Sequence, residues 1–216
     1  IIGVSTFVFS LLNWVLGPRD TTAASHFDVL PAGLALAVVG IAVWRYHRVV
    51  ALNDAKADAA IALSATRAYR YLTAAVGLGA LAFGLATEVG LVVGLLVNAG
   101  GDVIRTGRWW ATPLAFSLTA LGVGAGLWGR QWLLQQTRAD AANPTERTTQ
   151  SRRTYMFAVF GISVLATLIA ASIVLFQVLH TILDGELSAG VFEDVKYGIG
   201  VVAAAGVISG YQWRAL

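Results

Sequence analysis

Residues 154–183 read TYMFAVFGISVLATLIAASIVLFQVLHTIL, a stretch that contains no Asp, Glu, Lys or Arg. A helix rises about 1.5 Å per residue, so roughly 20 apolar residues cross the hydrocarbon layer of a bilayer, which is about 30 Å thick. The near-continuous apolarity also excludes a membrane β-barrel, whose strands of about ten residues alternate between apolar and polar side chains. The stretch therefore predicts a transmembrane helix.

Five other stretches of the chain have the same character. The whole sequence is 57% hydrophobic and only 12% charged, which leaves too little polar surface to cover a soluble globule. We therefore expect an all-α, polytopic transmembrane bundle of six helices. The predicted spans are residues 1–17, 29–44, 71–98, 109–129, 154–183 and 197–213.

Three similar boxes of sequence close alternate spans. They are Trp44-Arg45-Tyr46-His47-Arg48, Trp128-Gly129-Arg130-Gln131-Trp132 and Ser209-Gly210-Tyr211-Gln212-Trp213. A shift of 84 residues carries Trp44 onto Trp128, and a shift of 81 carries Trp132 onto Trp213. The second and third hairpins also open on matching tyrosines, Tyr71 and Tyr155. Their common order predicts an internal triplication of a two-helix hairpin.

The triplication divides the chain into three hairpins and two linkers. We expect a first hairpin at 1–52, a cytoplasmic linker at 53–70, a second hairpin at 71–136, a cytoplasmic linker at 137–153 and a third hairpin at 154–216. In this register the first span lacks its N-terminal half, so we expect the natural chain to begin upstream of Ile1.

The hairpin pattern resembles a bacterial multi-spanning membrane family that is classed only as a domain of unknown function. In that family, tandem two-helix repeats open on Arg or Thr followed by Tyr and close on a Trp-x-x-His/Gln-Trp/Arg box. The resemblance covers nearly the whole chain and implies a helical fold in the bacterial inner membrane. It transfers no catalytic residue, because the family has no assigned activity. The boxes depart from the pattern at His47, which is the only histidine at its position, and at Ser209, which replaces tryptophan.

The basic residues predict the orientation in the membrane. Eleven of the 15 Lys and Arg residues fall on one side of the predicted spans, which the positive-inside rule makes cytoplasmic. An even number of spans then places both chain ends inside. The cytoplasmic set is Arg45, Arg48, Lys56, Arg67, Arg70, Arg130, Arg138, Arg147, Arg152, Arg153 and Arg214; the outer set is Arg19, Arg105, Arg108 and Lys196.

Two interpretations of the boxes remain open. In the first, aromatic rings and arginines anchor the helix ends among lipid headgroups, where each Arg near anionic phosphates contributes about 1 kcal/mol. In the second, His47, Gln131 and Gln212 form a polar cluster at the inner mouth of the bundle. The candidate anchors are Trp44, Arg45, Arg48, Trp128, Arg130, Trp132 and Trp213.

Glu88 is the only charged residue inside a predicted span. A carboxylate in hydrocarbon costs several kcal/mol unless it meets a partner, water or a proton. Three explanations remain open: a solvated position near the outer headgroups, a hydrogen bond between helices, and an ion or proton relay. The relay is weakened by the repeat, because Ser172 and Val4 occupy the equivalent positions.

No metal site or cofactor is expected from the spacing of ligand-type residues. The chain has no cysteine, which removes thiolate ligands. A haem or pigment held by His26, His47 or His180 is the alternative, because membrane-helix imidazoles ligate such groups. His47 and His180 fall at opposite ends of their spans and cannot share one metal.

Glycine pairs at Gly90 and Gly94 and at Gly206 and Gly210 predict close helix packing. No sequence motif indicates an enzyme or a nucleic-acid partner. We therefore expect a non-catalytic integral membrane subunit or scaffold that packs against other membrane proteins, copies of itself and lipid. The alternative is a small transporter or channel that uses Glu88 and the inner polar cluster.

Overall fold

A computed structural model describes residues 1–18, 22–57, 59–100, 107–140, 149–185 and 190–215. All regular secondary structure in these residues is helical, so the predicted all-α fold is confirmed. Four segments, 23–54, 63–100, 111–137 and 150–183, are long and apolar enough to cross a membrane. The helices are α1 (Ile2–Leu16), α2 (Ala23–His26), α3 (Leu30–Ala57), α4 (Ala59–Gly100), α5 (Ala111–Asp140), α7 (Gln150–Leu183) and α8 (Gly190–Ala215).

Proline marks several helix ends. α1 ends at Leu16, and Gly17 leaves the helix with an extended backbone at φ −71° and ψ 171°, as expected for the residue before Pro18. Pro31 and Pro113 lie in the first turns of α3 and α5, where a missing backbone N–H breaks no helical hydrogen bond.

The polar connections are more helical than the sequence-based boundaries suggest. α3 continues to Ala57 and α4 begins at Ala59, so most of the 53–70 linker is helix. This segment is rich in alanine and has no glycine or proline, so its residues have high helix propensity. In the 137–153 linker, residues 137–140 extend α5 and residues 150–153 begin α7, whereas 141–148 lie outside the described residues.

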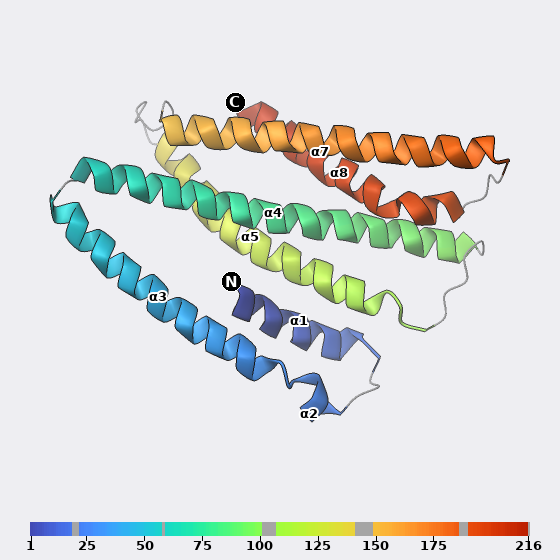
Figure 1. Ribbon diagram of the computed structural model, residues 1–216, viewed down its shortest axis with the longest axis horizontal. Coiled ribbons are helices and arrows are strands. Elements are labelled where there is room, and N and C mark those ends of the chain that lie inside the picture. Colours follow the sequence, from blue (N-terminus) through green and yellow to red (C-terminus); the bar gives the residue numbers. More distant parts are fainter. Residues whose placement is uncertain (19–21, 58, 101–106, 141–148, 186–189, 216) are drawn as a thin grey trace.

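The helices form a main bundle and an attached pair (Figure 1). In the bundle, α4 packs along α5 and α8, and α7 packs along α8. The attached pair consists of α1 and α3, and it contacts the bundle mainly through α1 and α5. Three pairs of helices that are close in the chain pack as neighbours, α1 with α3, α4 with α5 and α7 with α8.

The contact between α4 and α5 depends on glycine. A Cβ atom built on Gly124 would lie 2.5 Å from the backbone nitrogen of Leu81, and one built on Gly77 would lie 2.5 Å from that of Trp128. No side chain fits at such distances, so these glycines let the two backbones touch. The hydrophobic effect does not drive helices together in lipid. Close van der Waals contact between the helices stabilises their association instead.

The contact between α4 and α8 is equally close. A Cβ atom on Gly200 would lie 2.0 Å from the carbonyl oxygen of Ala86, and Gly90 packs against the ring of Tyr197. Gly94 lies in the same contact, beside the carboxylate of Glu193.

The second glycine pair predicted from the sequence, Gly206 and Gly210, is exposed. Gly206 and Gly210 take no part in packing within this chain, because a Cβ atom on either would meet no atom within 4 Å.

Two glycines of α5 provide a matched test of this packing. We expect Gly124→Ala to lower the free energy of unfolding by about 1–3 kcal/mol, because the added methyl group overpacks the contact with α4. Gly122→Ala should be neutral or stabilising by up to about 1 kcal/mol, because Gly122 is open and alanine favours helix. Unfolding of the purified variants in detergent measures both changes. Equal stability of the two variants would contradict the packing.

Candidate functional site

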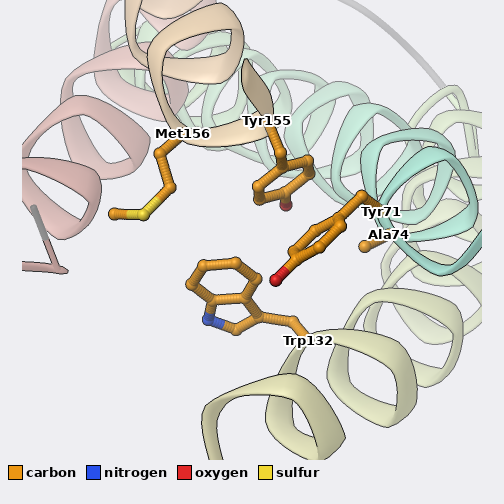
Figure 2. Close-up of a cluster of buried hydrophobic side chains, with 5 residues drawn as sticks. All are labelled: Tyr71, Ala74, Trp132, Tyr155 and Met156. Atoms are coloured by element: carbon orange, nitrogen blue, oxygen red, sulfur yellow. The ribbon is translucent and has the colours of Figure 1, made fainter. Parts of the chain in front are cut away.

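Aromatic side chains from three helices meet inside one end of the bundle. Figure 2 shows Tyr71 of α4, Trp132 of α5 and Tyr155 of α7 pointing toward one another. The ring of Tyr155 lies 5.4 Å from that of Tyr71 and 5.1 Å from that of Trp132, measured between centroids. Ala74 and Met156 complete this buried cluster. The cluster joins α4, α5 and α7 at this end of the bundle.

Helix α8 joins the same cluster by a hydrogen bond. The indole Nε1 of Trp132 donates to the hydroxyl of Tyr211 at 2.7 Å. The ring of Tyr211 also meets the ring of Trp128 edge-on, with centroids 5.6 Å apart. All four helices of the bundle therefore meet at Trp132, whose side chain is completely buried.

Arg152 brings a positive charge to this end of the bundle. The residue is only 8% exposed, and its guanidinium carbon lies 5.4 Å from the centroid of the Trp132 ring, a favourable cation–π distance. Its Nη2 donates to Oε1 of Gln136 at 3.0 Å. Its Nη1 is buried and has no hydrogen-bond partner among the described residues.

Two buried glutamines also have unpaired polar atoms here. Gln212 is completely buried, and within the part of the chain that the structure describes neither its amide oxygen nor its amide nitrogen has a partner. Gln212 lies on the same buried face of α8 as Ala204 and Ile208, which precede it at intervals of four residues. The amide nitrogen of Gln135 on α5 is likewise unpaired. Buried polar groups are almost always hydrogen-bonded, so these unpaired amide atoms are an uncommon feature of this end of the bundle.

The predicted inner polar cluster is not assembled as a group of three. Gln212 is inside the bundle, and Gln131 is partly buried on α5. His47 is exposed on α3, a helix that packs against α1 and α4, and its ring lies against that of Tyr46. The structure instead places Gln212 in the bundle end that contains Arg152 and Gln135.

The predicted anchors divide into exposed and buried residues. Trp213 is 71% exposed, and Trp44 is exposed with the guanidinium of Arg48 over its ring at 5.2 Å. Arg45 and Arg130 are exposed as well, whereas Trp128 is partly buried. The prediction that Trp132 anchors the chain in lipid is wrong, because its side chain is buried among α4, α7 and α8.

Glu88 forms a hydrogen bond between two helices. The hydroxyl of Ser117 on α5 donates to Oε2 of Glu88 on α4 at 2.5 Å. Ser117 is completely buried, and Glu88 is partly buried. Of the three explanations that the sequence left open, the described geometry corresponds to the interhelical hydrogen bond.

Helix α8 contains a buried ion pair that the sequence analysis did not predict. Glu193 and Lys196 precede the predicted span 197–213, but both lie within α8, and Lys196 is only 7% exposed. Their side chains form an ion pair beside Gly94 and Trp109. The spacing of three residues between opposite charges was the available signal, since such residues are neighbours on a helix.

The three histidines lie in separate places. Nε2 of His26 donates to the carbonyl oxygen of Ser10 at 3.0 Å, and the His26 ring packs against Trp14. His180 lies 2.8 Å from the carboxylate of Asp184, and His47 is on α3. Among the residues that the structure describes, no three His, Cys, Asp or Glu side chains are grouped so as to hold a metal ion.

An open cavity of about 500 Å³ lies between α1, α4, α5 and α8. Its walls include Phe9, Phe83, Phe116, Thr87, Tyr197 and Val201. Glu88 is not among its lining residues, and the walls are mostly apolar. The cavity is therefore suited to apolar groups such as lipid chains and offers little to a hydrated ion.

The comparisons with known proteins place the bundle in a family. A model described as a domain of unknown function, DUF5671, matches residues 67–207. This range covers most of α4 and α8 together with the whole of α5 and α7, and it leaves out the attached pair α1 and α3. No curated protein and no solved structure matches the chain.

A double-mutant cycle tests the bond between Glu88 and Ser117. We expect Glu88→Leu and Ser117→Ala to be coupled by about 0.6 kcal/mol, the typical value for a hydrogen bond between membrane helices, and by at most about 1.7 kcal/mol. Glu88→Gln should be tolerated better than Glu88→Leu, because the amide can still accept from Ser117. Unfolding in detergent measures the coupling.

Thr87→Val is the control. The Thr87 hydroxyl donates to the carbonyl oxygen of Phe83 within α4, so this substitution removes a hydroxyl without removing a hydrogen bond between helices. Additive effects of the Glu88 and Ser117 substitutions would instead place Glu88 in solvent or among headgroups.

Proposed function

We propose that this chain, which belongs to the DUF5671 family, is a non-catalytic integral membrane subunit or scaffold that packs against other membrane proteins and lipid. The family is described only as a domain of unknown function, so the proposal rests on the geometry of the bundle. The observation that carries it is the contrast between closely packed interior contacts and open apolar outer faces.

The interior contacts support a static role. The backbones of α4, α5 and α8 touch at Gly77, Gly124 and Gly200, and packed interiors resist continuous deformation. The polar group in the middle of the bundle, Glu88, is engaged by Ser117.

The outer faces support packing against other membrane helices. Gly206 and Gly210 lie one turn apart on an exposed face of α8, beside Val207, which is 63% exposed. Gly122 and Gly126 form a similar open pair on α5. Small residues at this spacing let a second helix approach closely, and no described helix of this chain packs on either pair.

The alternative is a small transporter or channel. Its support is Glu88, because an ionisable residue in an apolar helix commonly marks an ion or proton pathway. The hydrogen bond to Ser117 and the apolar walls of the neighbouring cavity favour the scaffold. A transport role would require water to reach Glu88.

We further propose that the chain resides in the bacterial inner membrane, crosses it six times and has both ends in the cytoplasm. The split of basic residues supports this orientation. α8 has 26 residues, which at 1.5 Å per residue gives about 39 Å, enough to cross the hydrocarbon layer.

Single cysteines test the topology, because the chain contains no other thiol. We expect Asn53→Cys and Asn143→Cys to react with an impermeant thiol reagent only after the cells are permeabilised. Leu183→Cys, at a position that is 85% exposed, should react in intact cells. The reverse labelling pattern would contradict the orientation.

Leucine substitutions test the scaffold role. Gly206→Leu combined with Gly210→Leu should reduce the size of the assembly extracted from native membranes, because the side chains block approach of a partner helix. The stability of the bundle should stay unchanged, since both glycines are open within the chain. Mass photometry after extraction with lipid measures the assembly.

Gly161→Leu on α7 is the matched control, because Gly161 is also open but has no glycine partner one turn away. An assembly of unchanged size in the double variant would argue against this face as the docking surface. A wild-type chain that is extracted alone would argue against the scaffold role itself.

A further inference from the structure

The cavity between α1, α4, α5 and α8 is walled by aromatic rings, and we call it the aromatic groove. The ring of Phe116 on α5 meets the ring of Phe9 on α1 edge-on, with centroids 6.1 Å apart. It meets the ring of Phe83 on α4 in the same way at 5.6 Å. Phe83 and Phe116 are nevertheless exposed, so the rings form walls that face open space. The volume of about 500 Å³ is typical of a site that holds a small ligand.

The polar side chains of the groove do not require a polar ligand. The Thr87 hydroxyl donates within α4 at 2.9 Å, and the Thr112 hydroxyl donates to Oδ1 of Asn13 at 3.1 Å. Both hydroxyl protons are therefore used within the chain. Tyr197 contributes the remaining polar side chain of the wall, and it is exposed. An apolar wall that meets no atoms loses van der Waals contacts, so the groove favours an apolar occupant.

A partner helix fits this groove less well than a flexible chain. Membrane helices approach one another most closely at small residues, and the open glycines Gly206 and Gly210 of α8 offer such a place. The groove is instead bordered by the bulky rings of Phe9, Phe116 and Tyr197. These rings keep a helix backbone at a distance but leave room for a single hydrocarbon chain. The lipids of a bilayer supply such chains.

Contacts with α1 place an exposed arginine beyond the groove. Phe9 and Asn13 of α1 contact groove residues on α5. Further along α1, the carbonyl oxygen of Leu16 accepts a hydrogen bond from Nη1 of Arg108 at 3.3 Å. Phe9 and Leu16 are seven positions apart, which is about 10 Å along a helix axis. Arg108 is exposed, and among the described residues no carboxylate pairs with it. Its guanidinium can therefore bind a phosphate oxygen.

We propose that the aromatic groove holds one acyl chain of a membrane phospholipid whose phosphate lies against Arg108. The chain contacts α1, α4, α5 and α8 together, so it joins the attached pair to the bundle. Figure 1 shows α1 lying between α3 and α5, and the pair contacts the bundle mainly through α1 and α5. The proposal rests on residence in a membrane but not on docking to other proteins. A chain that is extracted without protein partners would bind the same lipid.

Tryptophan substitutions test the groove. Val201→Trp fills the groove from α8, whereas Val92→Trp places the same side chain at an exposed position of α4 outside the groove. The proteins are placed in nanodiscs of phosphatidylcholine with a trace of phosphatidylglycerol that carries a photoreactive diazirine in its acyl chain. After irradiation, mass spectrometry measures the label on residues 83–87 of α4 and 112–116 of α5, which neither substitution changes.

Wild type should carry more label on these two segments than on exposed apolar residues elsewhere. We expect Val201→Trp to lower this label about fivefold or more, because the chain would overpack the filled groove. Val92→Trp should leave the label unchanged. Equal label in the three proteins, or label spread evenly over the exposed apolar residues, would overturn the proposal. Unchanged label together with a smaller assembly in Val201→Trp would assign the groove to a partner helix and would also overturn it.

Arg108→Gln tests the position of the phosphate. It should lower the label about fivefold, as for one arginine near an anionic headgroup. Arg130→Gln is the matched control, because Arg130 is also exposed but lies further along α5 and outside the groove, and it should leave the label unchanged. Equal losses in the two variants would show general attraction to the membrane surface and would overturn the assignment of Arg108.

Thermal unfolding in detergent distinguishes loss of the lipid from loss of the fold. Added phosphatidylglycerol should raise the Tm of wild type and Val92→Trp, because a ligand that binds only the folded state stabilises it. Val201→Trp should unfold cooperatively with a Tm that does not respond to the lipid. Thr87→Leu narrows the groove by a smaller step and should respond less than wild type, so it replaces Val201→Trp where that variant does not fold. An equal response in all of these proteins would overturn the proposal.

Discussion

Direct contact between the backbones of α4 and its neighbours is the constraint on which the rest of the structure depends. Water drives apolar side chains together in a soluble protein, but lipid is as apolar as those side chains and supplies no such drive. Association must come from van der Waals contact and hydrogen bonds. Gly124 and Gly200 provide the contact by letting α5 and α8 reach the backbone of α4.

The central position of α4 determines which side chains of the neighbouring helices can contact one another. Because α5 lies so close, the buried Ser117 reaches Glu88, and the carboxylate gains a partner within the bundle. Further along the same contact, Tyr71 meets Trp132, and Tyr155 joins them from α7. The aromatic cluster in turn supports Arg152 against the Trp132 ring. The candidate site is thus a consequence of the helix packing.

The family match and the packing divide the chain at nearly the same place. Residues 67–207 belong to the DUF5671 domain and form the bundle around α4. The pair of α1 and α3 lies outside this match and contacts the bundle mainly through α1. A triplicated hairpin remains a prediction from the boxes, and the three helix pairs are consistent with it. In the structure, however, the first pair is peripheral and the other two share one interior.

The sequence by itself determined the helical class, the apolar segments and several helix ends. These depend on properties read along the chain: uninterrupted apolarity over 154–183 and the proline after Gly17. Tertiary structure alone decided which side of each helix meets a neighbour. Trp132 and Trp213 occupy equivalent places in their boxes, yet one is buried and the other is 71% exposed. Gly90 packs against α8, whereas Gly206 is open. The physical reason is that burial depends on the rotation and tilt of each helix against its neighbours. These helices are apolar on nearly every side, so their sequences contain no polar face from which the rotation could be predicted.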